Sequence, residues 1–210
     1  MRKVTLLVLF LFVAAFCSLW GEEYDFRQTR WGMSVKEVRA SEHWRLLRKE
    51  GGEKEYRLVY SASIAGLDGC IVYGFSEYKL RSALYSFSIE ESGEALQKYR
   101  YLKDNITKKY GKPDSSKSIF SEEKKRELGP FSFVLLLPLA FRSNDYLEKG
   151  QLVMETVWTT DFTYITLLVK KEDEKYLIEI GYEHKRWTDD RRKEEEERRN
   201  QEEKELFDAI

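Results

Sequence analysis

The side chains best suited to nucleophilic chemistry are two cysteines and two histidines, Cys17, Cys70, His43 and His184. A cysteine nucleophile needs a neighbouring base that lowers the pKa of its thiol, and only the two histidines could serve. No motif links either histidine to Cys70, which lies in an apolar run. The sequence therefore predicts that Cys70 is a small buried hydrophobic residue, with a nucleophile or an intermolecular disulfide as the alternative.

The sequence lacks other patterns of catalytic, metal-binding and cofactor-binding residues. Glu90 and Glu91 are adjacent, so on a strand they point to opposite faces and cannot form an acid–base pair. Asp68 lies in a glycine-containing turn, and a calcium site needs more oxygen ligands at regular spacing. There is no Gly-rich phosphate loop, His-Glu-x-x-His helix or Gly-x-Ser-x-Gly motif. We therefore expect no catalytic residues, no metal and no cofactor.

Length and composition indicate a folded protein of one or two domains. The chain has 210 residues, of which 42% are hydrophobic, 35% charged and 14% aromatic, and this mixture can bury a core. Its 36 basic and 37 acidic residues leave a formal net charge of −1. Nucleic-acid-binding domains need a basic surface, so we expect no nucleic-acid partner.

Residues 1–21 have the pattern of a secretory signal peptide. Arg2 and Lys3 form a positive start, an apolar stretch over 4–19 follows, and the chain then becomes hydrophilic. The apolar stretch is shorter than the roughly 20 residues that span a bilayer. The sequence therefore predicts an exported protein, either periplasmic or secreted.

Three fates of this segment remain open. Cleavage could follow Cys17 or Gly21, Cys17 could be lipidated, or the segment could stay as an uncleaved anchor. Small residues precede a lipidated cysteine in bacterial lipoproteins, and the bulky Phe16 departs from that pattern. All of these place residues 22–210 outside the cytoplasm. Membrane contact is expected only through this segment or a lipidated Cys17.

Residues 24–90 are predicted to form a unit of one helix followed by an antiparallel meander. Ser34 and Glu37 have the spacing of a capping box, so a short helix is expected directly after Ser34. Trp31 precedes this cap and is expected to anchor packing, with an exposed binding residue as the alternative. Apolar residues then alternate with polar ones, which is typical of strands with one wet face.

Residues 91–184 are predicted to repeat the order of helix and meander. Ser92 is expected to cap a helix that Gly111 and Pro113 end. One face of this helix carries apolar residues at helical spacing. Those residues are Ala95, Leu96, Tyr99, Leu102, Ile106 and Tyr110. The strands expected after it are 115–120, 152–159, 163–170 and 176–182.

The stretch Phe131–Phe141 is very apolar, is broken by Pro138 and is too short to span a membrane. A buried strand with its exit loop is one interpretation. The other is an exposed apolar loop that contacts a partner or a membrane surface. The residues of this candidate partner surface are Phe131, Phe133, Leu135, Leu137 and Phe141.

Residues 185–210 form a charged tail without Gly or Pro, for which a solvated helix is expected. Together the patterns predict an α+β fold: an antiparallel sheet with helices on one face and a charged C-terminal helix. The folded domain is expected over 22–184, in two helix-plus-meander units of about 24–90 and 91–184.

Several short motifs carry a resemblance to known proteins. They are Trp31-Gly32-Met33-Ser34-x-x-Glu37-Val38, Tyr73-x-Phe75 with Lys79-Leu80, Tyr110-Gly111-Lys112-Pro113 and Ile180-x-Tyr182. Over about residues 26–184 the chain resembles a group of small secreted bacterial proteins of unknown function. Its Gly-Met-Ser-x-x-Glu-Val opening also resembles the small lipoproteins that assist outer-membrane barrel assembly, which implies two helices on a short antiparallel sheet. The chain is twice as long as those lipoproteins, and neither resemblance implies catalytic residues.

The signal segment and the missing catalytic motifs favour a non-enzymatic module that binds another protein of the bacterial cell envelope. Phe131–Phe141 is the partner surface expected for this function. The alternative is a binder of a small molecule or lipid, with a pocket between sheet and helices. That pocket would be lined by Tyr73, Phe75, Tyr85 and Phe87.

Overall fold

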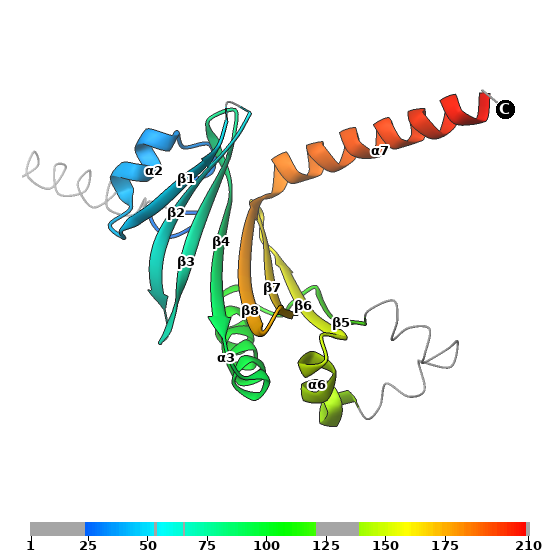
Figure 1. Ribbon diagram of the computed structural model, residues 1–210. Helices are drawn as coiled ribbons and strands as arrows, with labels where there is room; N and C mark the ends of the chain where they lie inside the picture. Colours follow the sequence, from blue (N-terminus) through cyan, green and yellow to red (C-terminus); the bar gives the residue numbers. More distant parts are fainter. Residues whose placement is uncertain (1–23, 53, 65, 121–138, 209–210) are drawn as a thin grey trace, which may run out of the picture.

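The computed structural model describes residues 24–52, 54–64, 66–120 and 139–208 (Figure 1). These residues form an α+β fold with one eight-stranded antiparallel sheet and four helices, which confirms the predicted fold class. The helices are α2 (Val35–Ser41), α3 (Ser92–Tyr110), α6 (Leu139–Glu148) and α7 (Lys185–Asp208). The strands are β1 (Leu46–Gly51), β2 (Glu55–Ile64), β3 (Leu67–Ser76), β4 (Lys79–Ile89), β5 (Ser115–Phe120), β6 (Leu152–Thr159), β7 (Thr163–Glu172) and β8 (Lys175–His184).

The sheet consists of two meanders joined through their last strands. Its strand order is β1-β2-β3-β4-β8-β7-β6-β5, and at the junction Tyr85 of β4 lies opposite Ile180 of β8. A helix precedes each meander, and α6 is inserted between β5 and β6. We call α2 with β1–β4 the first half, and α3 and α6 with β5–β8 the second half. This order matches the two helix-plus-meander units that the sequence predicts.

Three helices cover one face of the sheet. The register places Tyr73 of β3 and Phe87 of β4 on the same face. Val38 of α2 is buried in the hydrophobic cluster of Tyr73, and Tyr99 of α3 is buried in that of Phe87. Leu147 of α6 belongs to this second cluster. The core therefore lies between the sheet and these helices in two clusters, and β4 contributes side chains to both.

Helix α2 begins as the sequence predicts. The Glu37 backbone N–H donates to Ser34 Oγ over 3.3 Å, and the Ser34 N–H donates to Glu37 Oε2 over 2.7 Å. This reciprocal pair is a capping box, which satisfies backbone donors that a helix start leaves free. The expected helix start is therefore confirmed.

Helix α3 covers the second half and ends where the sequence predicts. Its buried stripe holds Tyr99 and Ile106, and Gly111 ends it with a φ of +87°, which glycine adopts without steric cost. The start differs by one residue. Ser92 is the first helical residue rather than the cap, because Glu91 has the extended backbone of a cap position and makes no side-chain capping bond.

Only the end of the apolar stretch Phe131–Phe141 is described, and there a helix stands in place of the expected exit loop, while the expected strand lies outside the described residues. Helix α6 begins at Leu139, directly after Pro138 in the sequence, and proline disfavours a helical conformation in the residues before it. Residues 131–138 lie outside the described residues. The side chains proposed as a partner surface, including that of Phe141, are therefore not placed by the structure.

Helix α7 is anchored at its start and then leaves the domain (Figure 1). Thr188 is buried and donates to Glu183 Oε2 over 3.3 Å, and the Tyr164 hydroxyl donates to Asp189 Oδ1 over 2.7 Å. Beyond Asp190 its side chains are exposed, as expected for a solvated charged helix. None of the described helices combines the length and the apolar character that crossing a membrane requires.

Candidate functional site

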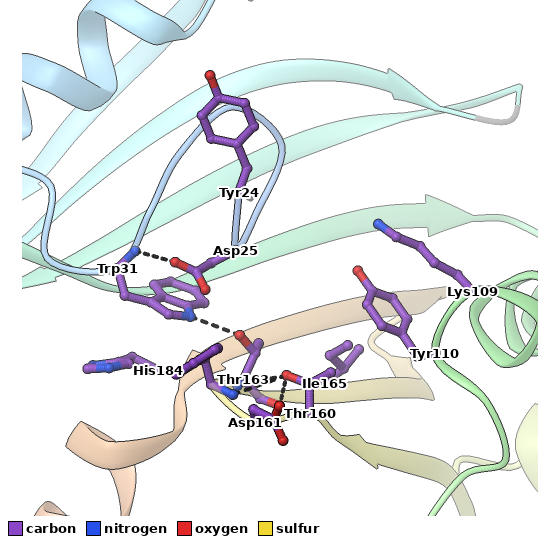
Figure 2. A pocket seen from close by; sticks show the side chains of 11 residues that line it. Tyr24, Asp25, Trp31, Lys109, Tyr110, Thr160, Asp161, Thr163, Ile165 and His184 are labelled. Atoms are coloured by element: carbon purple, nitrogen blue, oxygen red, sulfur yellow. Dashed lines mark hydrogen bonds between the residues drawn. The ribbon is translucent and has the colours of Figure 1, made fainter. Parts of the chain in front are cut away.

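A cleft of about 770 Å³ opens on the helix-bearing face where the two halves meet (Figure 2). Four segments surround it: residues 24–33, which we call the arm, the end of α3, the β6–β7 turn and the end of β8. Its lining combines aromatic, acidic, basic and hydroxyl side chains. They belong to Tyr24, Asp25, Trp31, Lys109, Tyr110, Thr160, Asp161, Phe162, Thr163, Ile165 and His184.

The arm is held on the sheet by one buried aromatic residue. The ring of Phe26 lies 5.6 Å from that of Tyr73, 5.0 Å from that of Tyr85 and 4.9 Å from that of Tyr182, measured between centroids. Tyr85 and Tyr182 belong to β4 and β8, the two strands at the junction. Phe26 therefore packs on both halves and fixes the arm across them.

A hydrogen-bonded pair of buried side chains, Glu42 and Tyr73, holds the arm through Arg27. Glu42 Oε2 accepts a hydrogen bond from the Tyr73 hydroxyl over 2.6 Å and lies 3.2 Å from Arg27 Nε. Burial, together with this hydrogen bond, raises the pKa of Tyr73, so the phenol stays protonated and can donate. The arm is thus tied to the end of α2 as well as to the sheet.

Trp31 forms the wall of the cleft and connects the halves through hydrogen bonds (Figure 2). Its indole Nε1 donates to Thr163 Oγ1 over 2.9 Å, and its backbone N–H donates to Asp25 Oδ2 over 2.8 Å. The next residue, Gly32, donates its N–H to the Leu80 carbonyl over 2.9 Å. The indole ring is therefore held in one orientation. Trp31 is half-buried, so it is a packing anchor, as predicted, and also lines the site.

The β6–β7 turn presents an exposed aromatic side chain at the mouth of the cleft. Thr160 Oγ1 accepts from the Thr163 N–H over 3.0 Å, and the Thr160 N–H donates to the Thr163 carbonyl over 2.9 Å. These bonds close the turn around Asp161 and Phe162. Phe162 is 63% exposed, so its ring offers free apolar surface at this turn.

His184 lies at the end of β8 beside Trp31. The two rings are stacked with centroids 6.1 Å apart, and His184 Nδ1 lies 3.5 Å from Arg81 Nη1. Burial and then the Arg81 guanidinium lower the pKa of His184, against a smaller opposite effect of Asp25. The imidazole is therefore neutral at neutral pH and can both donate and accept a hydrogen bond.

The opposite wall comes from the end of α3. Lys109 Nζ lies 4.7 Å from the centroid of the Tyr110 ring. Burial, followed by the neighbouring phenols of Tyr110 and Tyr85, raises the pKa of Tyr182 beneath this wall. The Tyr182 phenol therefore stays neutral, and Lys109 supplies a cation on this side of the cleft.

Of the residues that the sequence suggested for chemistry, Cys17 lies outside the described residues, and Cys70, His43 and His184 are not brought together. Cys70 lies on the face of the sheet opposite to the helices, because its neighbour Ile71 points into the core. Burial raises the pKa of the Cys70 thiol, which disfavours the thiolate that a nucleophile needs. His43 is exposed on the first half, and His184 lines the cleft on the helix-bearing face.

The sequence predicts, as its alternative, a ligand pocket between the sheet and the helices, but the four side chains named for it pack in that space. Tyr73, Phe75 and Phe87 are buried core residues, and Tyr85 is half-buried against Phe26. These side chains fill the space between sheet and helices rather than line a hollow. The cleft lies beside them, at the edge of the helical layer.

Sequence reasoning missed most residues of the cleft. Asp25 precedes the first periodic segment, and Thr160, Asp161 and Phe162 mark only a break between two strands. A Thr-x-x-Thr spacing across that break is the one local signal, because a threonine hydroxyl can bond to the backbone of its own turn.

The described residues contain no group of three or more His, Cys, Asp or Glu side chains that could hold a metal ion. Comparison of the chain with protein-family models, curated proteins and solved structures found no match.

Proposed function

We propose that this protein is an exported, non-enzymatic module of the bacterial cell envelope that binds a segment of another protein in the cleft. The observation that carries the proposal is the set of aromatic side chains that line the cleft at the junction of the two halves. Trp31 is fixed by hydrogen bonds from both its indole and its backbone, and Phe162 lines the same cleft and is 63% exposed.

A fixed aromatic wall favours binding for two reasons. Large aromatic side chains dominate the binding energy of many protein interfaces. Side chains that are already held in place lose little conformational entropy when a partner arrives. Trp31, Tyr110 and Phe162 supply such surface, and each belongs to a different structural element.

The polar groups of the cleft suit the backbone of a peptide segment. Asp161 offers acceptors on one side, and Lys109 offers a donor on the other. His184 Nδ1 accepts from Arg81, so the Nε2–H of the neutral ring is left to donate to a peptide carbonyl. This spread of donors and acceptors along an open cleft fits an extended segment better than a single charged ligand.

Export is proposed from the N-terminal sequence. Residues 1–21 have the signal-peptide pattern, and the arm begins at residue 24. Cleavage after Cys17 or after Gly21 would leave every cleft residue in the mature protein. The motif resemblance to secreted bacterial proteins supports the same compartment.

A small molecule or lipid in the same cleft is the second candidate. The cleft volume of about 770 Å³ falls in the range of ligand pockets, roughly 300–1,000 Å³. A ligand would raise the melting temperature of the purified protein by mass action. A thermal shift with a metabolite or lipid, lost in Trp31→Ala, would favour this candidate over a protein partner.

Site-specific photocrosslinking in cells tests the leading proposal. A photoreactive phenylalanine analogue at Phe162 is expected to capture one envelope protein, because this ring stands at the mouth of the cleft. The matched control is Ile119, which is 41% exposed on the edge strand β5. The same products from both positions, or no product from Phe162, would contradict the proposal.

A further inference from the structure

A second surface lies on the first half, between α2 and the strands beside it. It is a groove of about 560 Å³, and it shares no lining residue with the cleft. None of the described residues that line the groove is acidic. They are Val35, Lys36, Arg39, Ala40, Tyr56 and Tyr78.

Tyr78 is placed over the groove by a strained turn. Glu77 and Tyr78 connect β3 to β4 in a two-residue hairpin turn closed by the pair Ser76–Lys79, with φ values of +51° and +60°. Such turns normally carry Asn-Gly or Asp-Gly, because positive φ is costly for other residues. Backbone strain concentrates at functional sites. Here it holds a tyrosine that is 52% exposed.

The charge of the groove comes from α2. Lys36 and Arg39 are exposed and three positions apart, so they share one side of the helix. The carboxylate of Glu37, which lies between them in sequence, is bonded to the backbone and hydroxyl of Ser34. The groove therefore presents two cations, two phenol rings and an aliphatic floor. Its complement is an acidic segment that carries large apolar side chains.

The same chain carries such a segment on α7. The last turns of this helix hold Glu202, Glu203 and Glu205 with one basic residue, Lys204, among them. Glu202 Oε1 lies 3.6 Å from Arg198 Nε, so Glu203 and Glu205 are the carboxylates left for a partner. Leu206 and Phe207 follow and are 67% and 80% exposed. An α-helix rises about 1.5 Å per residue, so Leu206 lies about 30 Å from the start of α7. Figure 1 shows α7 extending away from the side of the domain that carries α2. The last turns of α7 are therefore out of reach of the groove on their own chain.

We propose that the last turns of α7 from one copy dock in the groove of a second copy. Leu206 and Phe207 would lie against Tyr56 and Tyr78. Glu203 and Glu205 would face Lys36 and Arg39. The contact is head-to-tail, so each copy keeps one free groove and one free helix end, and the assembly can grow. The surface is small, so association is expected to be weak and concentration-dependent. This inference does not rest on the function proposed for the cleft.

Two variants and their mixture test the proposal. Lys36→Glu/Arg39→Glu reverses the charge of the groove, and Leu206→Ser/Phe207→Ser removes the apolar end of α7. All four side chains are exposed, and glutamate suits position 36 at the start of α2. Glutamate at position 39, in the last turn of α2, should cost only about 0.3–1 kcal/mol, so both variants should fold. Sedimentation velocity of the full chain is measured from micromolar to millimolar concentration at low and high salt.

The wild-type protein is expected to grow in mass with concentration and to lose this growth at high salt. Each variant alone is expected to stay monomeric. Their equimolar mixture is expected to form heterodimers and nothing larger, because it contains one intact groove and one intact helix end per pair. The control Lys112→Glu/Lys117→Glu changes two exposed cations outside the groove and should behave as wild type.

A monomeric wild-type protein at every concentration would overturn the proposal. So would association that persists in both variants, or a mixture that stays monomeric although each variant is folded. Binding of the monomer to vesicles with anionic phosphatidylglycerol headgroups, lost in Lys36→Glu/Arg39→Glu, would assign the groove to a membrane surface instead.

Discussion

The two halves of the molecule cover the same face of the sheet in different ways. The second half uses α3, which is 19 residues long, and α6, which is 10 residues long. The first half has only the 7 residues of α2 and is completed by the arm. Phe26 of the arm occupies the place over β4 and β8 that a longer helix would fill.

This difference explains where the cleft lies. A regular helix buries one stripe of side chains and leaves few backbone groups to bond with its surroundings. An irregular segment must satisfy its backbone through side chains and turns, as Asp25 does for the Trp31 N–H. The less regular segment that covers the first half therefore brings polar and aromatic groups together at its edge, and the cleft lies there rather than over α3.

The largest expected effect comes from removing Phe26. Phe26→Ala should lower the free energy of unfolding by about 3–5 kcal/mol, because a buried phenylalanine leaves a large cavity. It should also abolish crosslinking from position 162 at temperatures where the domain remains folded, because the arm no longer holds Trp31. Urea unfolding and the crosslinking assay measure the two effects.

The matched control lies under the helical cover of the second half. Leu102→Ala should cost a comparable 2–5 kcal/mol, since Leu102 is buried in α3. Crosslinking from position 162 should persist in this variant, because α3 holds no bond to the arm's Trp31. Equal loss of crosslinking in both variants would show that the arm has no more influence on the cleft than α3 has.

The last hairpin turn of each half allows a comparison in which the expected changes in stability are smaller but opposite in sign. The β3–β4 turn has two residues at positive φ, whereas the β7–β8 turn has only Asp173, at +54°. Tyr78→Gly should therefore raise stability by about 1 kcal/mol, since a left-handed conformation costs a non-glycine residue about 1–2 kcal/mol. Glu174→Gly should lower stability by about 0.5–1 kcal/mol, because glycine adds unfolded-state entropy without relieving strain.

Thermal unfolding of both variants measures these opposite signs. A gain of about 1 kcal/mol corresponds to roughly 2–4 °C in Tm for a chain of this size. Tyr78→Gly should also weaken self-association, because the ring over the groove is lost. If Tyr78→Gly gains stability and still self-associates, the strained turn does not serve the proposed contact in the groove.

The contrast between halves also shows what sequence reasoning can reach. The strands and α3 were predictable because their apolar residues recur at the period of the element, and α2 because Ser34 and Glu37 form a local cap. The arm has no period, and its partners are distant. Trp31 bonds to Thr163, which lies 132 positions along the chain, so no local pattern contains this contact.

The smallest expected effect concerns the last residues of the two meanders. β4 ends at Ile89 in the core, whereas β8 ends at His184 in the cleft. His184 faces Asp25 of the arm, Arg81 of β4, and Arg186 and Asp190 of α7.

The fold lowers the pKa of His184, so the unfolded chain binds this proton more readily than the folded one. The stability contributed by the neutral imidazole is therefore fully present above the unfolded pKa of about 6.5 and is lost as the pH falls below it. Urea unfolding from pH 8 to pH 5 should show this loss in the wild type and a shallower one in His184→Gln. His43→Gln, at an exposed position of the first half, should follow the wild-type curve. Identical pH dependence in all three proteins would mean that the charge state of His184 is not coupled to the junction between the halves.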